Sequence, residues 1–160
     1  MPQTLARIAS LLVVVSLALA PVRADDLEKL RQKLAREDDP ADRAKITAKI
    51  GEEMLGLIAR RYREGAYTDA EDMLADYLKA MREAYDGLLA SGREAHHKPK
   101  GFKDLEIHLR RGAHRLERIR RSLPLEQQAD VQAVIKQMQD MRSDLLEALL
   151  TGHVKKEKEQ

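Results

Sequence analysis

Residues 62–74 read YREGAYTDAEDML, and this stretch decides the fold because it joins two long segments with helical periodicity. Gly65 is placed to take the left-handed backbone conformation that often ends a helix. Thr68 and Glu71 stand at the spacing of a capping box, which predicts the start of the next helix. The stretch therefore predicts a tight corner between two antiparallel helices.

The rest of the chain carries the same helical signal, and no segment shows the sustained period-2 alternation of a strand. Asp39 and Pro40 suit the N-cap and the first position of the helix before the corner. Apolar spacing predicts a short helix marked by Leu27, Leu30 and Leu34, long helices over about 41–64 and 102–122, and two more with apolar positions from Ala70 to Leu88 and from Val131 to Leu149. These helices and their mostly short connections predict an all-α fold, either an antiparallel helical bundle or a short open array of four to five helices.

The first 24 residues have the pattern of a secretory signal peptide. Arg7 precedes an unbroken apolar run over residues 8–20, and Val22 and Ala24 suit the −3 and −1 positions of a cleavage site. The apolar run is shorter than the ~20 residues that a membrane-spanning helix needs. We expect cleavage after Ala24 and export to the periplasm or to the outside of the cell. An uncleaved N-terminal membrane anchor is the alternative.

The mature chain is predicted to be one helical domain over residues 25–150, followed by a charged, disordered tail over 151–160. Loss of Arg7 and Arg23 with the signal peptide leaves 27 basic and 27 acidic residues, against 29 and 27 in the full chain. This balance and the scarcity of aromatic residues count against nucleic-acid binding. The absence of cysteine excludes disulfides, thiolate metal sites and a thiol nucleophile.

The corner resembles that of a tetratricopeptide repeat at Leu57, Tyr62, Gly65, Tyr67, Ala70 and Leu74. Ile58 and Tyr77 depart from the small residues usual in that repeat, and the closing proline is missing. The resemblance covers about residues 44–78 and implies a protein-binding helix pair. A repeat array needs about three units, and the best internal match is between residues 66–74 (AYTDAEDML) and 101–109 (GFKDLEIHL). An ordinary pair of antiparallel helices is the alternative.

A second stretch, LPLEQQADVQAVIKQM over residues 123–138, resembles a helix start found in Spy-like periplasmic chaperones, with Pro124 in place of their threonine. Those are small exported helical proteins that cradle unfolded clients, and they usually carry two such motifs, whereas this chain has one. The resemblance implies an alternative function as a chaperone or stress sensor. Proline at the first helical position is also a good helix start in any protein.

The side chains that could support catalysis or bind a metal do not form a recognisable set. His108 and His114 are six residues apart, which places them on nearly opposite sides of a helix rather than on one metal. His96 and His97 could hold a metal only loosely. The serines lack a nucleophile-elbow context, and the glycines do not form a phosphate-binding loop. We predict a non-enzymatic protein with no cofactor and no metal site.

Charge is distributed unevenly along the chain, with a net −5 over residues 64–86 and +6 over 93–121. Arg110, His114, Arg118 and Arg121 follow helical spacing and form one basic stripe, which indicates an anionic partner. The alternative is that the acidic third helix pairs with the basic fourth helix within the chain. A narrow apolar seam on the fourth helix (Leu105, Leu109, Gly112, Leu116 and Ile119) has the spacing of a dimerisation seam or of internal packing.

We therefore expect an exported helical module that binds or scaffolds an unidentified protein partner, with no nucleic acid and no stable membrane anchor after cleavage. Tyrosine and arginine are the residue types enriched at interface hot spots. The predicted partner-binding residues are Tyr62, Tyr67, Tyr77, Arg110, His114, Arg118 and Arg121.

Overall fold

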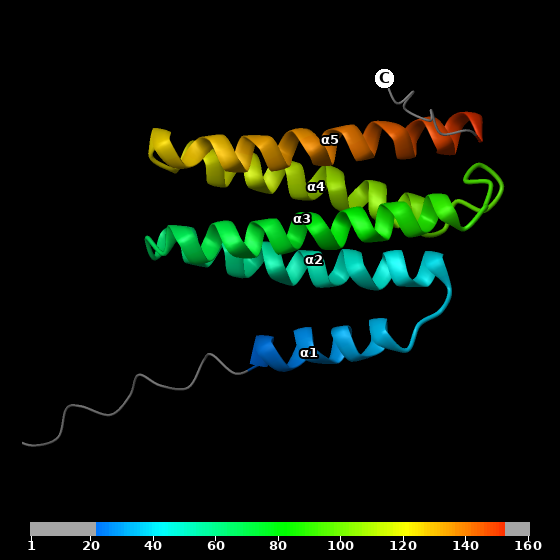
Figure 1. Ribbon diagram of the computed structural model, residues 1–160, viewed down its shortest axis with the longest axis horizontal. Coiled ribbons are helices and arrows are strands. Elements are labelled where there is room, and N and C mark those ends of the chain that lie inside the picture. The colour runs from blue at the N-terminus through cyan, green and yellow to red at the C-terminus, as the bar shows by residue number, and fades with distance from the viewer. Residues whose placement is uncertain (1–21, 153–160) are drawn as a thin grey trace, which may run out of the picture.

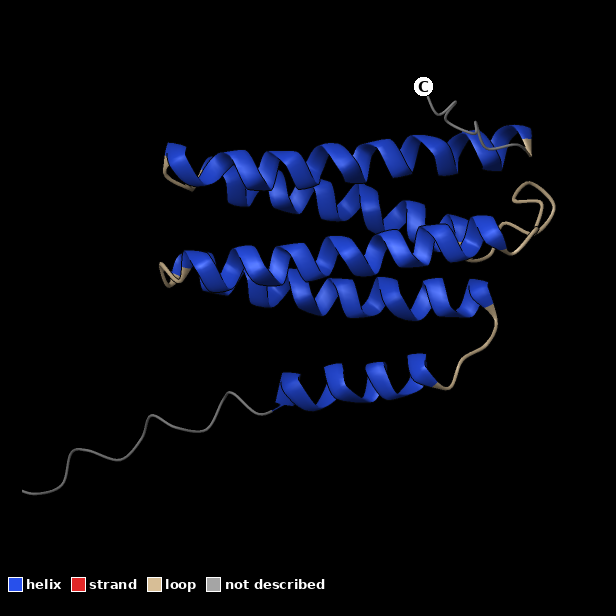
Figure 2. Cartoon of the chain, viewed as in Figure 1, coloured by secondary structure: helices blue, strands red, loops and turns tan. Residues whose placement is uncertain are grey.

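The computed structural model describes residues 22–152. Most of the predicted signal peptide (1–21) and of the predicted tail (153–160) lies outside the described residues. Within them the chain is all-α, as predicted, with five α-helices, one 3-10 turn and no strand (Figure 1; Figure 2). The elements are α1 (Val22–Ala35), α2 (Pro40–Arg63), α3 (Tyr67–Ala90), α4 (Phe102–Arg121), η1 (Leu125–Gln127) and α5 (Gln128–Thr151). None of these helices is long and apolar enough to cross a membrane.

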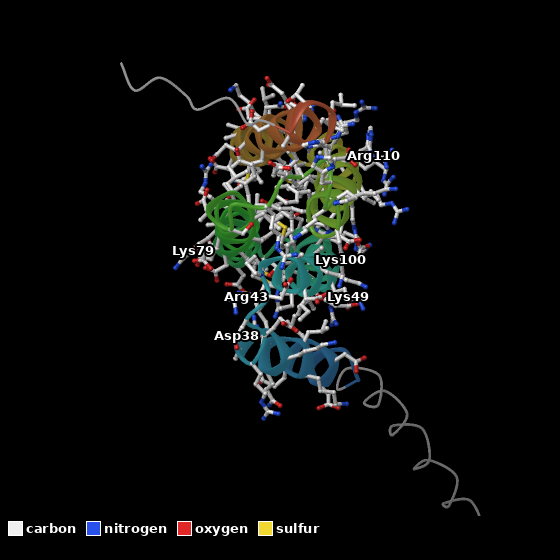
Figure 3. All side chains as sticks on the ribbon, turned by 90° about the vertical axis from the view of Figure 1, so that its right-hand side faces the viewer. Asp38, Arg43, Lys49, Lys79, Lys100 and Arg110 are labelled. Atoms are coloured by element: carbon white, nitrogen blue, oxygen red, sulfur yellow. The ribbon has the colours of Figure 1, made fainter. Side chains whose placement is uncertain are left out.

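Successive helices from α2 to α5 run in opposite directions and close into a four-helix bundle, in which the packed pairs α2–α4 and α3–α5 run parallel (Figure 1). Helix α2 packs against α3 and α4, and α5 packs against the same two helices, so that α3 and α4 occupy opposite corners (Figure 3). Helix α1 lies outside the bundle against α2 and contributes Leu27, Leu30 and Leu34 to the apolar cluster. The sequence predicted either a closed bundle or an open array of helices, and the structure is the closed bundle.

Local capping residues fix the ends of α2 close to the predicted bounds. Oδ1 of Asp39 accepts hydrogen bonds from the backbone N–H groups of Ala41 (2.9 Å) and Asp42 (3.0 Å), with Pro40 in the first helical position. At the other end Gly65 has φ of 74°, as predicted. Its N–H donates to the carbonyl of Tyr62, which belongs to a Schellman closure.

The capping box predicted at Thr68 is wrong. Helix α3 begins at Tyr67 with Ala66 as its N-cap, and no side chain caps it. The reason lies in the corner itself: the Schellman closure runs on to Ala66, whose N–H donates to the carbonyl of Arg61 at 3.0 Å. The carbonyl of Ala66 then accepts the first bond of α3, from Ala70, at 3.0 Å. Thr68 is thus already inside the helix.

The connection from α4 to α5 also differs from its prediction. Pro124 precedes the 3-10 turn η1, and α5 starts only at Gln128, so this proline is not the first residue of an α-helix. The side chain of Gln128 holds the turn by donating to the carbonyl of Leu123 at 3.0 Å. Helix α5 then continues to Thr151, one residue into the predicted tail.

The core lies along the axis of the bundle and draws on every helix. Leu105, Leu109 and Leu116 on α4 have no exposed surface, so the apolar seam of that helix faces inward and packs within one chain. Gly51 on α2 and Gly112 on α4 allow side chains of neighbouring helices to pack close to the backbone at the centre of the bundle. A Cβ on Gly112 would lie 2.8 Å from the hydroxyl of Tyr77 and 2.8 Å from Cε of Met138.

Candidate functional site

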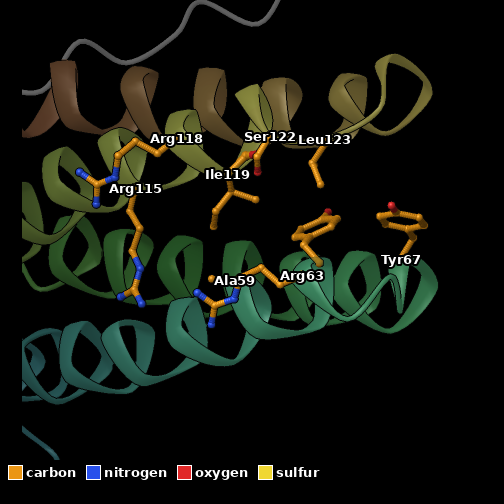
Figure 4. Close-up of a pocket in the computed structure, with 9 residues that line it drawn as sticks. Ala59, Arg63, Tyr67, Arg115, Arg118, Ile119, Ser122 and Leu123 are labelled. Carbon is orange, nitrogen blue, oxygen red and sulfur yellow. The ribbon is translucent and has the colours of Figure 1, made fainter.

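A groove of about 510 Å³ opens at the end of the bundle where α2 turns into α3 (Figure 4). The last turns of α2 and α4 and the first residue of α3 form its walls. Its polar lining consists chiefly of three arginines and two tyrosines, and Ile119 and Leu123 give it an apolar wall. These polar residues are Arg63, Arg115, Arg118, Tyr62 and Tyr67.

The positive charge of the groove has no acidic residue in its lining to balance it. Arg63 and Arg118 are exposed and form no ion pair with any of the described residues. Arg115 is partly buried, and its Nη1 lies 3.2 Å from the Glu52 carboxylate outside the groove. Guanidinium groups bind carboxylates and phosphates through paired hydrogen bonds. The groove is therefore suited to an anionic group.

Tyr62 lines the groove, but its hydroxyl is buried. The residue is only 4% exposed, and its buried hydroxyl has no hydrogen-bond partner among the described residues. Burial, reinforced by the nearby charges of Glu71 and Asp130, raises the pKa of Tyr62 to about 12, so the hydroxyl stays protonated. Leaving such a group unpaired costs roughly 1–3 kcal/mol. The groove therefore meets the ring of Tyr62 rather than its hydroxyl.

Tyr67 stands beside Tyr62 at the mouth of the groove. The two ring centroids lie 6.4 Å apart with a tilt of 44°, which is a favourable arrangement for aromatic rings. Tyr67 is only partly buried and its hydroxyl makes no hydrogen bond within the described residues, so its ring can contact a partner. Of the three tyrosines predicted to contact a partner, Tyr67 is thus partly exposed, whereas Tyr62 beside it is buried in the core.

Tyr77 does not belong to that surface. It has no exposed area, and its hydroxyl lies 3.0 Å from Nε2 of His108 inside the bundle. Burial raises its pKa far above the ordinary range. Its assignment as a partner-binding residue is therefore wrong: the apolar stripe of α3 that carries it faces the core.

The predicted basic stripe on α4 is divided between two grooves. Arg118 lines the groove just described, whereas Arg110 and His114 line a second groove of about 430 Å³ between α4 and α5. Arg121 lines neither groove, and its Nε lies 3.0 Å from the Glu117 carboxylate. The pKa of Glu117 is lowered to about 2, chiefly by hydrogen bonds from Arg120 and Arg121. The stripe is thus a set of separate contacts rather than one surface.

The alternative in which α3 and α4 neutralise each other does not hold for the described residues. No ion pair joins these helices, because they occupy opposite corners of the bundle. Figure 3 shows Lys79 of α3 and Arg110 of α4 projecting from opposite sides. The acidic side chains of α3 form no ion pair among the described residues; they are Asp69, Glu71, Asp72, Asp76, Glu83 and Asp86.

A polar cluster at the centre of the bundle was not predicted from the sequence. His108 is 6% exposed and contacts Tyr77 through Nε2, while its Nδ1 lies 4.0 Å from the Glu52 carboxylate. Burial lowers the pKa of His108 to about 4, although Glu52 acts in the opposite direction. The imidazole is therefore neutral at physiological pH. Tyr77, His108 and Glu52 line neither of the two grooves, and the Tyr77–His108 pair is part of the packed interior.

Arg63 and Arg115 are the charged groove residues that were not predicted from the sequence. Arg63 follows Tyr62 directly in the sequence. Whether it lies close to α4 depends on how α2 packs against α4, and no local sequence pattern encodes that packing. Arg115 lies on α4 outside the predicted stripe and turns toward α2. Its spacing of three residues from Arg118 was the available signal.

No protein-family model matches the chain, and searches among curated proteins and solved structures found no similar protein.

Proposed function

We propose that this protein is an exported, non-enzymatic helical module that binds an acidic segment of a protein partner. The groove between α2, α3 and α4 is the binding site in this proposal. One observation carries it: three arginines line a groove without a carboxylate, next to the partly exposed ring of Tyr67. The corner with its tyrosines and the arginine of the basic stripe, both expected from the sequence to contact a partner, meet at this point.

The chemistry of the lining favours carboxylate side chains on an extended segment. Arg63 and Arg118 have free guanidinium groups that can bind a carboxylate with two hydrogen bonds each. The volume of about 510 Å³ suits a few side chains rather than a folded domain. Tyr67 and Ile119 supply the apolar and aromatic surface that accompanies such anchors in protein interfaces.

A charge-reversal experiment tests the groove. The probe is a fluorescent peptide of alternating glutamate and glycine, titrated with the purified chain and followed by anisotropy. The double variant Arg63→Glu, Arg118→Glu is expected to bind at least about tenfold more weakly than the wild type. Lys49→Glu, Arg111→Glu is the matched control, since it makes the same charge change on the same two helices at exposed residues outside both grooves. Equal losses in the two variants would mean that the peptide responds to overall charge, and the groove proposal would fail.

A crosslinking experiment identifies the partner in cells. A photoreactive amino acid replaces Tyr67 in one strain and Lys79, which projects from α3 away from α4, in another. One dominant crosslinked protein is expected from position 67 and none from position 79, and the arginine double variant should remove it. A broad spread of unrelated proteins, together with suppression of aggregation of unfolded clients, would instead support the Spy-like chaperone alternative.

Export is tested separately. N-terminal sequencing of the protein recovered from the envelope or medium is expected to begin at Asp25, because Ala24 is the predicted last residue of the signal peptide. Recovery of the intact N-terminus in the membrane fraction would favour the uncleaved anchor.

A further inference from the structure

The connector between α3 and α4 brings three metal-ligating side chains together. One donor atom from each of Glu94, His96 and His97 lies within 4.8 Å of the other two. The His96 and His97 rings have centroids 3.7 Å apart, and Nε2 of His97 lies 3.6 Å from the Glu94 carboxylate. The sequence had shown only the two histidines, and the turn adds the carboxylate.

The backbone of this turn is held in place. The N–H groups of His97 and Lys98 both donate to the carbonyl of Glu94, at 3.1 and 2.9 Å. Ala95 is 2% exposed and packs into the core, so it anchors the turn between the candidate ligands. Arg93 pairs with the Asp39 carboxylate at the start of α2. The three ligands therefore project from a fixed base, which lowers the entropic cost of gathering them around an ion.

The ligand side chains themselves are free to reach an ion. Glu94, His96 and His97 are all exposed. The His96 ring lies against Gly152 at the end of α5, since a Cβ on that glycine would lie 2.4 Å from His96 Nδ1. Zinc takes nitrogen and oxygen ligands at about 2.0–2.2 Å, so two donors on one ion lie up to about 4 Å apart. Rotation of exposed side chains is enough to close a 4.8 Å spread to that value.

We propose that Glu94, His96 and His97 form a site for a divalent metal ion of the zinc type. Two imidazoles and one carboxylate suit Zn²⁺, Ni²⁺ and Cu²⁺ better than Mg²⁺ or Ca²⁺, which prefer all-oxygen sites. Three protein ligands leave a coordination position for water. The bound ion fastens the turn between α3 and α4 at the end of the bundle opposite the arginine groove (Figure 1). The site is independent of the proposed peptide binding.

Calorimetric titration of the full chain with Zn²⁺ alone tests the site, using protein prepared without a polyhistidine tag. One ion per chain is expected for the wild type, and no heat beyond dilution is expected with Mg²⁺. His96→Ala and His97→Ala should each weaken the affinity at least about tenfold, which is the scale of losing a supporting residue around a metal. Glu94→Gln should also weaken it. His114→Ala is the matched control, an exposed histidine on α4 that should keep the wild-type affinity.

Two further readings make the result decisive. Circular dichroism confirms that each variant is folded, which is expected because the three residues are exposed. Zinc should raise the Tm of the wild type and leave that of the His96→Ala, His97→Ala double variant unchanged, because an ion that binds only the folded chain stabilises it. Binding of Zn²⁺ by this double variant with wild-type affinity, or an equal loss in His114→Ala, would overturn the site.

Discussion

The hydroxyl of Tyr77 on α3 lies 3.0 Å from Nε2 of His108 on α4, so a hydrogen bond joins the two helices that occupy opposite corners of the bundle. Both residues are buried, and two glycines make room for them. A Cβ on Gly51 would lie 2.6 Å from His108 Nε2, and one on Gly112 would lie 2.8 Å from the Tyr77 hydroxyl. This contact therefore ties the centre of the bundle together across its diagonal.

Replacing Tyr77 with phenylalanine should destabilise the fold by about 1–2 kcal/mol, because it leaves the buried His108 nitrogen without its partner. Urea unfolding followed by circular dichroism measures the change. Tyr67→Phe is the matched control: its hydroxyl makes no hydrogen bond within the described residues, so the free energy of unfolding should change by less than about 0.5 kcal/mol. Equal effects in the two variants would argue against a hydrogen bond at the centre.

Stability should fall as the pH drops from neutral. The pKa of His108 is lowered from 6.5 to about 4 in the folded chain, so between these values the unfolded chain binds more protons than the folded one. The expected loss between pH 7 and pH 5 is about 2 kcal/mol from this residue. The carboxylates with lowered pKa values, among them Asp39, Glu64 and Glu117, lose their contribution only at lower pH.

Urea unfolding at pH 7 and pH 5 isolates this effect. The His108→Gln variant should be less stable than the wild type at pH 7. Its free energy of unfolding should change little between pH 7 and pH 5, because the titrating imidazole is gone. His114→Ala, which removes an exposed histidine, should retain the wild-type difference. A His108→Gln variant with the full pH dependence would show that another group carries it.

Two glycine-to-alanine substitutions should have opposite effects. Gly51→Ala places a methyl group 2.6 Å from His108 Nε2 and 2.8 Å from Cε of Met81, and the resulting overpacking should cost about 1–3 kcal/mol. Gly87→Ala on α3 meets no atom within 4 Å and should stabilise the chain by about 0.5–1 kcal/mol through helix propensity. Thermal unfolding should lower the Tm in the first case and raise it in the second.

The buried carboxylate of Glu106 should depend on Arg142. Nε of Arg142 lies 2.8 Å from Oε1 of Glu106, whose side chain is 9% exposed. Arg142→Ala leaves that carboxylate with only the longer contact to Arg110, at 3.7 Å, and should cost about 1–2 kcal/mol. Lys136→Ala breaks an exposed pair with Asp140 on the same helix and should change the free energy of unfolding by less than about 0.5 kcal/mol. Equal costs measured by urea unfolding would contradict this difference.

The sequence located most helix ends because capping is local. Asp39 and Gly65 act within a few residues of where they stand, and both predictions are confirmed. Thr68 failed as a cap because the Schellman closure of α2 reached the start of α3 first. That outcome depended on backbone hydrogen bonds rather than on the residue pattern.

The burial of individual side chains and their contacts across helices were harder to predict from the sequence. Tyr77 lay in the apolar stripe of the third helix together with Leu74 and Met81, and this spacing already indicated the core. The prediction that Tyr77 binds a partner is wrong, because its side chain has no exposed surface. Helix packing brings Arg63 and Arg118 to one groove, and the turn after α3 brings Glu94 to His96 and His97. Neither arrangement follows from a local sequence pattern. Export and the partner stay predictions.

The placement of α3 and α4 at opposite corners has a consequence for how the molecule meets charged surfaces. The full chain has a formal net charge of only +2, yet α3 has six acidic residues against two basic ones, and α4 has seven basic residues against three acidic ones. The bundle is therefore a transverse electric dipole. A negatively charged partner would turn it in solution so that α4 leads, before any atoms touch. The rate of that approach should fall steeply with ionic strength even though the protein is nearly neutral.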